Sequence, residues 1–215
     1  MKGSPSYDLR PVVREQVAYL FELFHGYKGL SASMTYGFGV YEVGVPVAGY
    51  AWQPPPPGAA KAVCPEAPQG VLSLSRMVAV PKGLRRLKHI SKPLRRQMGS
   101  LIDRTRWPVL VTYSDEGEGH NGFVYECSGW AKTDRNLRPV YEDADGVRCS
   151  SYSNGKHGGR DLERVGDTWI QRWENRVCAN GEAAAWMAAH GWVRVPTGRK
   201  YRNGRDAFTY ERRAA

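Results

Sequence analysis

A long apolar run, Val71–Val80, is the sequence feature that most constrains the fold. Most of its positions are hydrophobic, including positions next to each other, and this pattern is typical of a strand buried on both faces. Pro81 follows directly, and proline ends such a strand because it has no amide hydrogen for the sheet ladder. The run therefore predicts the central strand of a covered sheet and favours an α/β fold.

The segments around this run predict further elements. Apolar residues at helical spacing indicate helices, and β-rich runs bounded by glycine or proline indicate strands. In chain order we predict a helix over 11–24, a hairpin over 36–43 and 45–52, a loop over 53–70, the central strand, a helix over 91–106, a strand over 107–113, a short helix over 121–129 and a strand that opens at Trp130. A helix over 182–190 and strands over 192–195 and 207–210 follow.

The pattern weakens after residue 134. Residues 135–166 are rich in glycine, serine, asparagine and charge, and a connection this long is unusual in a compact domain. We therefore predict a catalytic core over 1–134, a partly mobile insertion over 135–180, and a C-terminal helix and strands over 181–215 that complete the same domain.

Positive charge is concentrated in two places. The formal net charge is +10, and residues 81–106 hold nine lysines and arginines against one acid, Asp103. Residues 192–215 hold seven against two acids. A solvated helix face seldom gathers so many cations, so we expect nucleic acid or a phosphate-bearing cofactor as partner. The cations expected on double-stranded DNA are Lys92, Arg95, Arg96, Arg199, Lys200 and Arg202.

The cysteines and the N-terminus suggest a cytoplasmic protein. No CxxC spacing occurs among Cys64, Cys127, Cys149 and Cys178, so a zinc ribbon or redox dithiol is not indicated, and we expect free thiols in a reducing cytosol. No apolar stretch follows the basic start, and no window approaches the roughly eighteen apolar residues of a membrane span.

The order of these elements resembles the GNAT-type acyltransferase fold. That resemblance implies a central mixed sheet flanked by helices, here with a C-terminal extension. In GNAT proteins the strand–loop–helix unit binds the pyrophosphate of an acyl-CoA, because loop amides and a helix N-terminus form an anion site. The glycine-containing family pattern is replaced here by Lys82–Ser91. The residues implied for cofactor binding are Arg85, Arg86, Lys88 and Ser91.

Several blocks together resemble the Mom family of phage DNA-modifying proteins. They are His25-Gly-Tyr27, Gly37-Phe-Gly-Val-Tyr41, Leu74-Ser-Arg-Met77, and Ser114-Asp115 followed by Gly122-x-Val-Tyr125-x-x-Ser-Gly-Trp130. They occur in this order over roughly residues 20 to 134. The resemblance implies an enzyme that installs an acetamido (methylcarbamoyl) group on the exocyclic amine of adenine, which shields phage DNA from restriction enzymes.

Four residues form the candidate catalytic set. Tyr125 lies where many GNAT proteins carry a general-acid tyrosine, with a packed core tyrosine as the alternative. Arg76 interrupts the apolar run and would anchor substrate or Asp115, unless it is a strand-edge arginine in solvent. Asp115 follows a strand at its carboxyl end and would orient the adenine amine or accept its proton; otherwise it caps a turn. His25 completes the set.

Metal binding and base stacking are further possibilities. His25, Asp115 and His120 could together bind a divalent metal with open positions, although a lone histidine is usually structural. Four tryptophans are candidates for stacking on bases, with core packing as the alternative: Trp52, Trp130, Trp169 and Trp173. Two rival functions stay open, a GNAT N-acetyltransferase that acts on a small amine or protein, and a basic DNA-binding protein without catalysis.

Overall fold

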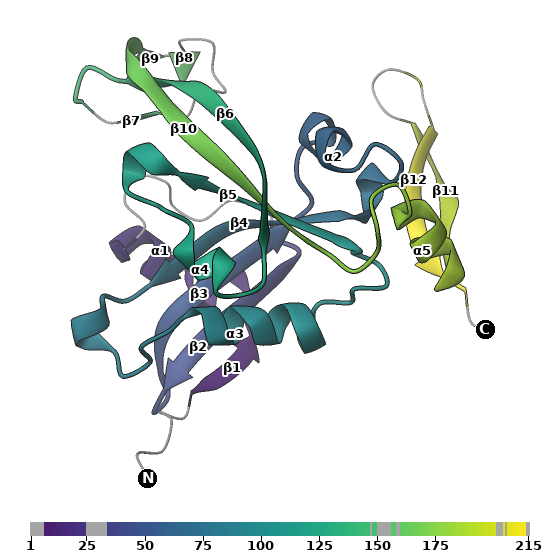
Figure 1. Ribbon diagram of the computed structural model, residues 1–215, viewed down its shortest axis with the longest axis horizontal. Helices are drawn as coiled ribbons and strands as arrows, with labels where there is room; N and C mark the ends of the chain where they lie inside the picture. The colour runs from purple at the N-terminus through teal and green to yellow at the C-terminus, as the bar shows by residue number, and fades with distance from the viewer. Residues whose placement is uncertain are drawn as a thin grey trace.

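The structure is a computed structural model that describes residues 7–24, 34–146, 148–149, 156–157, 160–200, 204 and 206–213. Within these residues, one mixed eight-stranded sheet forms the main body, and a smaller C-terminal unit lies at its side (Figure 1). The strands in spatial order are β1 (Asp8–Pro11), β2 (Tyr36–Glu42), β3 (Val45–Gln53), β4 (Val71–Ala79), β5 (Val109–Asp115), β10 (Glu163–Arg176), β6 (Ala131–Glu142) and β7 (Arg148–Cys149). The predicted fold class, a mixed sheet flanked by helices with a C-terminal extension, is confirmed.

β4 is the central strand predicted from the apolar run. It lies between β3 and β5, and its first four residues are buried. β4 and β5 are the parallel pair of this sheet, whereas the other described pairs are antiparallel. The parallel ladder joins only Val71–Ser73 to Val109–Val111. Beyond it the two strands separate, which opens the sheet at its centre.

Helices cover both faces of the sheet. Adjacent residues of β4 show this, because neighbouring side chains of a strand point to opposite faces. Leu72 packs in the cluster that contains α3 (Ser91–Arg96) and α4 (Phe123–Glu126), and Val71 packs with α2 (Pro57–Val63) and α5 (Ala183–Ala189). α1 (Ala18–Phe24) packs on Ala51 and Val78. The remaining short helical segments are η1 (Arg14–Gln16), η2 (Pro68–Gly70), η3 (Lys82–Leu84), the π-helical η4 (Gln97–Leu101) that extends α3, and η5 (Glu116–Glu118).

Two N-terminal segments differ from the prediction. The helix expected over 11–24 is confined to 18–24, because residues 8–11 pair with β2 as an edge strand. The proline-rich loop expected over 53–70 contains α2, which begins at Pro57. Proline suits the first turn of a helix, since the amide hydrogen it lacks has no partner there. The row of prolines therefore starts a helix as well as ending β3.

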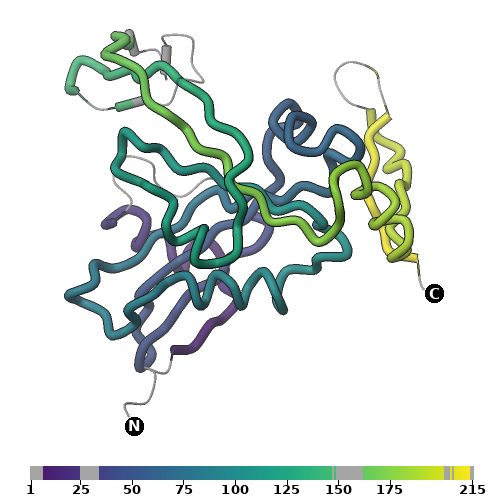
Figure 2. The backbone as a smooth tube through the Cα atoms, viewed as in Figure 1, coloured from purple at the N-terminus to yellow at the C-terminus, as the bar shows by residue number. Residues whose placement is uncertain are grey.

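The predicted insertion over 135–180 largely belongs to the sheet. β6 and β10 form a long antiparallel ribbon that attaches to β5 through β10 and extends beyond the core (Figure 2). The boundary predicted at residue 134 falls inside β6. Many ribbon residues are exposed, which explains the missing apolar period. The connection between the strands includes β7, β8 (Lys156–His157) and β9 (Arg160–Asp161), and its residues 147, 150–155 and 158–159 lie outside the described residues.

The C-terminal unit consists of α5 and the hairpin of β11 (Trp192–Lys200) and β12 (Asp206–Arg212). The Arg106 guanidinium carbon lies 4.2 Å from the ring centroid of Trp107, 5.5 Å from that of Trp192 and 4.9 Å from that of Tyr210. Trp192 Nε1 also donates to Thr105 Oγ1 at 3.1 Å. Contacts from residues 105–107, which follow η4, therefore hold the C-terminal unit against the main body. No helix among the described residues has the length and apolar character needed to cross a membrane.

Candidate active site

A cavity of about 300 Å³ lies where β4 and β5 separate. It is lined by residues of both strands, of η5 with the loop after it, and of α4. Arg76, Asp115, His120 and Tyr125 all line it. Three predicted catalytic residues and one predicted metal ligand, far apart in sequence, therefore meet at one cavity. His25, the remaining predicted member, lies outside the described residues.

Tyr125 is held on α4 between two tryptophans. Its ring centroid lies 5.9 Å from that of Trp130 and 5.8 Å from that of Trp173, and the residue is only 8% exposed. Burial raises the pKa of Tyr125, and a side-chain hydrogen bond with Thr112 lowers it in part. Tyr125 is thus packed in the core, as the alternative predicted, and is also part of the cavity wall. A buried phenol of this kind stays protonated at neutral pH and can donate a proton.

A close contact between Gly122 and Trp173 sets the position of α4. Gly122 precedes the helix with φ of +71°, and a Cβ built there would come within 2.2 Å of Trp173 Cζ2. Trp173 is itself fixed, because its Nε1 donates to Ser114 Oγ at 2.9 Å. Only glycine combines this backbone angle with this approach. β10 therefore supports the helix that carries Tyr125.

Asp115 caps a turn and lines the cavity. Its Oδ1 accepts hydrogen bonds from the backbone N of Gly117 at 3.0 Å and from Thr168 Oγ1 at 2.6 Å. These bonds hold the carboxylate at the carboxyl end of β5. Asp115 therefore caps a turn, as the alternative interpretation predicted, and its residue also lines the cavity.

Arg76 lies on β4, across the opening from Asp115. It is half-buried, and its Nη1 donates to the carbonyl oxygen of Ser75 at 2.7 Å. The side chain lines the cavity. A guanidinium here gives one wall of the cavity a positive charge, opposite the carboxylate of Asp115.

The described residues contain no group of three or more histidine, cysteine or acidic side chains that could hold a metal. His120 is exposed, and its backbone N donates to the carbonyl oxygen of Asp115 at 3.1 Å. Of the predicted set His25, Asp115 and His120, two members therefore lie together at the cavity. The third is outside the described residues.

The basic loop after β4 is organised by one buried carboxylate. Glu42, 8% exposed, accepts from the backbone N of Arg86 at 2.7 Å and from the backbone N of Leu87. Arg85 turns inward: its Nε donates to the carbonyl oxygen of Val80 at 2.7 Å and its Nη1 to that of Leu87. Burial lowers the pKa of Arg85. Arg85, predicted to bind the cofactor, therefore stabilises the loop itself.

The remaining cations of this region face solvent. Arg86 and Lys88 on the loop and Lys92, Arg95 and Arg96 on α3 are exposed. Ser91, half-buried at the start of α3, accepts through its carbonyl oxygen from Ser128 Oγ at 3.2 Å. Since Glu42 already occupies two loop amides, the phosphates of an acyl-CoA would rely on side chains. The exposed cations fit that need in charge.

The other predicted nucleic-acid residues lie on the C-terminal hairpin. Arg199 and Lys200 are exposed at the end of β11, and Arg202 lies outside the described residues. Among the tryptophans, Trp52, Trp130 and Trp173 are buried, as core packing requires. Trp169 differs, with 40% exposure and the Arg135 guanidinium carbon 4.4 Å from its ring centroid.

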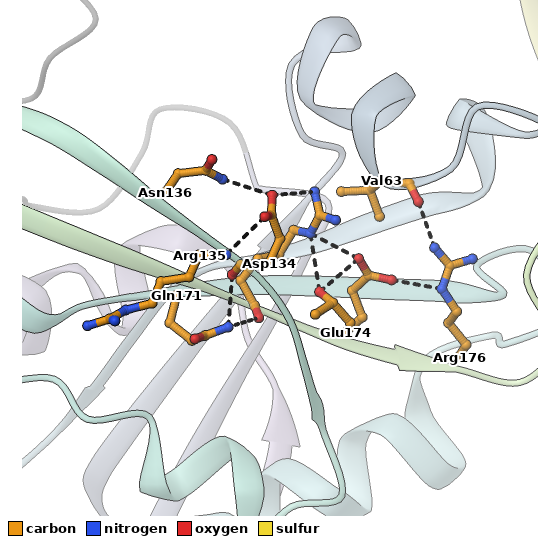
Figure 3. A network of polar contacts seen from close by, with 9 residues as sticks. Val63, Asp134, Arg135, Asn136, Gln171, Glu174 and Arg176 are labelled. Atoms are coloured by element: carbon orange, nitrogen blue, oxygen red, sulfur yellow. Dashed lines mark hydrogen bonds and ion pairs between the residues drawn. The ribbon is translucent and has the colours of Figure 1, made fainter.

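A second, larger groove of about 880 Å³ lies on the α2 side, at the junction of β6 and β10. Glu174, 5% exposed, lines it, forms an ion pair with Arg172 (Nε to Oε1, 3.0 Å) and accepts a hydrogen bond from Arg176 Nε at 2.8 Å (Figure 3). Arg176 Nη2 reaches the carbonyl oxygen of Val63 at 2.6 Å. These ion pairs and hydrogen bonds tie β10 to the end of α2. Arg172, Glu174 and Arg176 lie at alternate positions of β10, and sequence reasoning missed them.

Sequence reasoning also missed the residues that support Tyr125. Thr112, Ser114 and Gly122 lie beside candidates that were identified, but their roles depend on β10. Trp173 was considered only for stacking on bases or for the core. A predicted strand over residues 163–176, paired with β5, would have pointed to these roles. The mixed polar pattern of residues 163–176 concealed that strand.

The chain was compared with protein families, with curated proteins and with solved structures. A family model described as "Mom protein family" matches residues 6–184. No curated protein matches the chain in sequence. Solved structures with some similarity include an IAA acetyltransferase from Bacillus cereus ATCC 14579, at 13% identity and a TM-score of 0.49, over 79% of this chain and 100% of that chain. An acetyltransferase of Bacillus subtilis in complex with CoA has 9% identity and a TM-score of 0.48, over 80% and 98%.

Proposed function

The chain belongs to the Mom protein family, and from that premise we propose that it transfers a small acyl-derived group to the exocyclic amine of adenine in DNA. The observation that carries the proposal is that the family match spans the whole cavity at the β4–β5 opening, where Arg76, Asp115 and Tyr125 meet. The product expected from the family resemblance is the acetamido derivative of adenine.

The charge distribution supports DNA as the substrate. Exposed cations on α3, together with those of the C-terminal hairpin, would contact phosphates of DNA. The adenine amine lies in the major groove, yet chemistry on a base usually requires the base to leave the stack. A cavity of about 300 Å³ is large enough for one base beside the reacting group of a donor.

The chemistry of the amine sets the roles of the three side chains. Its lone pair is delocalised into the adenine ring, so it is a poor nucleophile and must lose a proton as the new bond forms. The Asp115 carboxylate is the group that would orient the amine and accept that proton. The phenol of Tyr125 would donate a proton to the departing group. The Arg76 guanidinium would stabilise negative charge that develops at the cavity wall.

The donor is a separate question, because the expected product attaches through a methylene carbon and ordinary acetyl transfer would instead give an amide. An acyl-CoA, when bound, would supply an acyl group with the CoA thiol as leaving group, which gives an amide; the acetamido product requires a donor that carries its leaving group on the methylene carbon. The exposed side chains of Arg86 and Lys88 would hold the phosphates of an acyl-CoA, with the loop kept in shape by Glu42 and Arg85.

Mass spectrometry of nucleosides tests the proposal. Plasmid DNA is isolated from bacteria that express the protein and is digested to nucleosides. A deoxyadenosine that is heavier by an acetamido group supports the proposal. Unmodified DNA from cells that contain folded protein contradicts it, and acetylation of a small amine or protein by the same preparation would favour an N-acetyltransferase.

A further inference from the structure

Phe123 is a large apolar side chain at the mouth of the cavity between β4 and β5. It lines this cavity together with Tyr125. Tyr125 is buried, whereas Phe123 is 61% exposed. A residue that lines a cavity and also faces solvent lies where the cavity opens. Phe123 therefore belongs to the rim, and Tyr125 belongs to the interior.

The backbone that carries this ring is held in place. Phe123 is the first residue of α4, and its backbone N donates to Asn121 Oδ1 at 3.1 Å. Gly122, directly before it, lies so close to Trp173 that no side chain fits between them. The carbonyl oxygen of Phe123 accepts from the backbone N of Cys127 at 3.0 Å. Because α4 is fixed in this way, little order would be lost when the ring meets a partner.

Positive charge lies beside this rim. Ser128 Oγ, just after α4, donates to the carbonyl oxygen of Ser91 at 3.2 Å, so the end of α4 contacts the start of α3 (Figure 1). Lys92, Arg95 and Arg96 of α3 are exposed. The apolar ring at the cavity mouth thus has a cationic helix as its neighbour, and this combination suits the apolar base stack and the charged backbone of DNA.

An adenine that enters the cavity must leave the base stack, and its loss of stacking and pairing opposes binding. The extruded base also leaves a gap in the duplex. Several proteins that distort DNA insert an apolar side chain between bases, and phenylalanine is one of the residues used. A ring that stacks on the bases beside the gap offsets part of the cost of extrusion.

We propose that Phe123 is a wedge for base extrusion: its ring fills the gap that the target adenine leaves and stacks on the neighbouring bases, while the adenine occupies the cavity. The wedge rests on the proposed function for its substrate, DNA. It assigns to Phe123 a part in binding the extruded state, separate from the proton transfers assigned to Asp115 and Tyr125.

The test compares the affinity of the full chain for two duplexes in fluorescence anisotropy titrations. The duplexes are identical except that one carries an abasic tetrahydrofuran residue in place of an adenine, so that the gap exists without extrusion. The wild type should bind the abasic duplex about tenfold more tightly. Phe123→Ala should bind both duplexes alike, since no ring fills the gap. Phe123→Trp keeps a stacking ring and should keep the preference.

Tyr19→Ala is a matched control, because Tyr19 is an exposed aromatic residue on α1 that does not line the cavity. It should show the wild-type preference, and thermal melting verifies that each variant is folded. Equal affinity of the wild type for the two duplexes, or a preference that persists in folded Phe123→Ala, would overturn the wedge.

The binding measurement needs no modification of DNA, so it separates the wedge from the proposed function. A preference that depends on Phe123, without modified deoxyadenosine in cells, supports the wedge and contradicts the proposed function. Modified deoxyadenosine together with an unchanged preference in Phe123→Ala supports the proposed function and overturns the wedge.

Discussion

The indole ring of Trp173 lies against the phenol ring of Tyr125, with ring centroids 5.8 Å apart. The two residues come from β10 and α4, and a third element, β5, fixes the indole through Ser114. A candidate active site on α4 therefore depends on a strand near the C-terminal end of the family match. Stability of the site and stability of this part of the sheet are linked.

Gly122 provides a direct test of that link. Its Cβ would collide with Trp173, so Gly122→Ala should combine left-handed backbone strain with overpacking and cost about 2–4 kcal/mol of unfolding free energy. Gly119 is a matched control: it has the same φ of +71° but nothing within 4 Å of the added methyl. Gly119→Ala should cost only about 1–2 kcal/mol. Equal losses in urea unfolding would contradict the packing argument.

The exposed cations near the cavity should determine how DNA binding depends on salt. Reversal of Lys92, Arg95 and Arg96 on α3 to glutamate should weaken binding to duplexes of any sequence. The slope of log affinity against log salt should become shallower by about 2–3, since each lost phosphate contact releases about one counterion fewer. Lys61→Glu on α2 is the control. An unchanged slope in fluorescence titrations would show that this surface is not the DNA footprint.

Glu42 should control the order of the basic loop. Glu42→Gln keeps the size of the side chain but removes its charge and one of two acceptor oxygens, so the amides of Arg86 and Leu87 should exchange hydrogen faster. The expected loss of stability is about 1–3 kcal/mol, the scale of a hydrogen bond to a charged group. Glu22→Gln on the exposed side of α1 is the control. Unchanged hydrogen exchange of these two amides in Glu42→Gln would show that Glu42 does not hold the loop in place.

The thiols should differ in reactivity. Burial raises the pKa of Cys64 to about 11, whereas Cys127 is exposed. Alkylation requires the thiolate, so at pH 8 iodoacetamide should modify Cys127 and leave Cys64 intact until the protein unfolds. Peptide mass spectrometry measures both sites. Rapid modification of Cys64 in folded protein would show that the segment after α2 opens readily.

The sequence predicted the elements that carry strong local patterns. The run over 71–80 became β4, the hairpin became β2 and β3, and the Gly122–Trp130 block contains α4. Arg76, Asp115 and Tyr125 were chosen from separate segments and line one cavity. Local pattern was sufficient there because each candidate lies in or directly after an element with its own signal.

What the sequence concealed depends on pairing between distant segments. The ribbon of β6 and β10 is half solvent-exposed, so polar residues alternate without an apolar period, and the segment resembled an insertion. The inward turn of Arg85 follows from loop carbonyls and Glu42, which lie far apart in sequence. The Thr112 hydroxyl donates to the carbonyl oxygen of Leu74 where the ladder of β4 and β5 ends, and these two residues lie far apart in sequence.

The most direct measurement compares nucleosides from plasmid DNA of cells that express the wild type, Tyr125→Phe or Asp115→Asn. Tyr125→Phe removes only a hydroxyl from a packed ring, and Asp115→Asn keeps the shape while it removes the charge. With the cavity as the active site, modified deoxyadenosine should be abundant for the wild type and should fall about a hundredfold or more in each variant, while folding and DNA affinity are unchanged. Modification at the wild-type level in both variants would contradict this assignment.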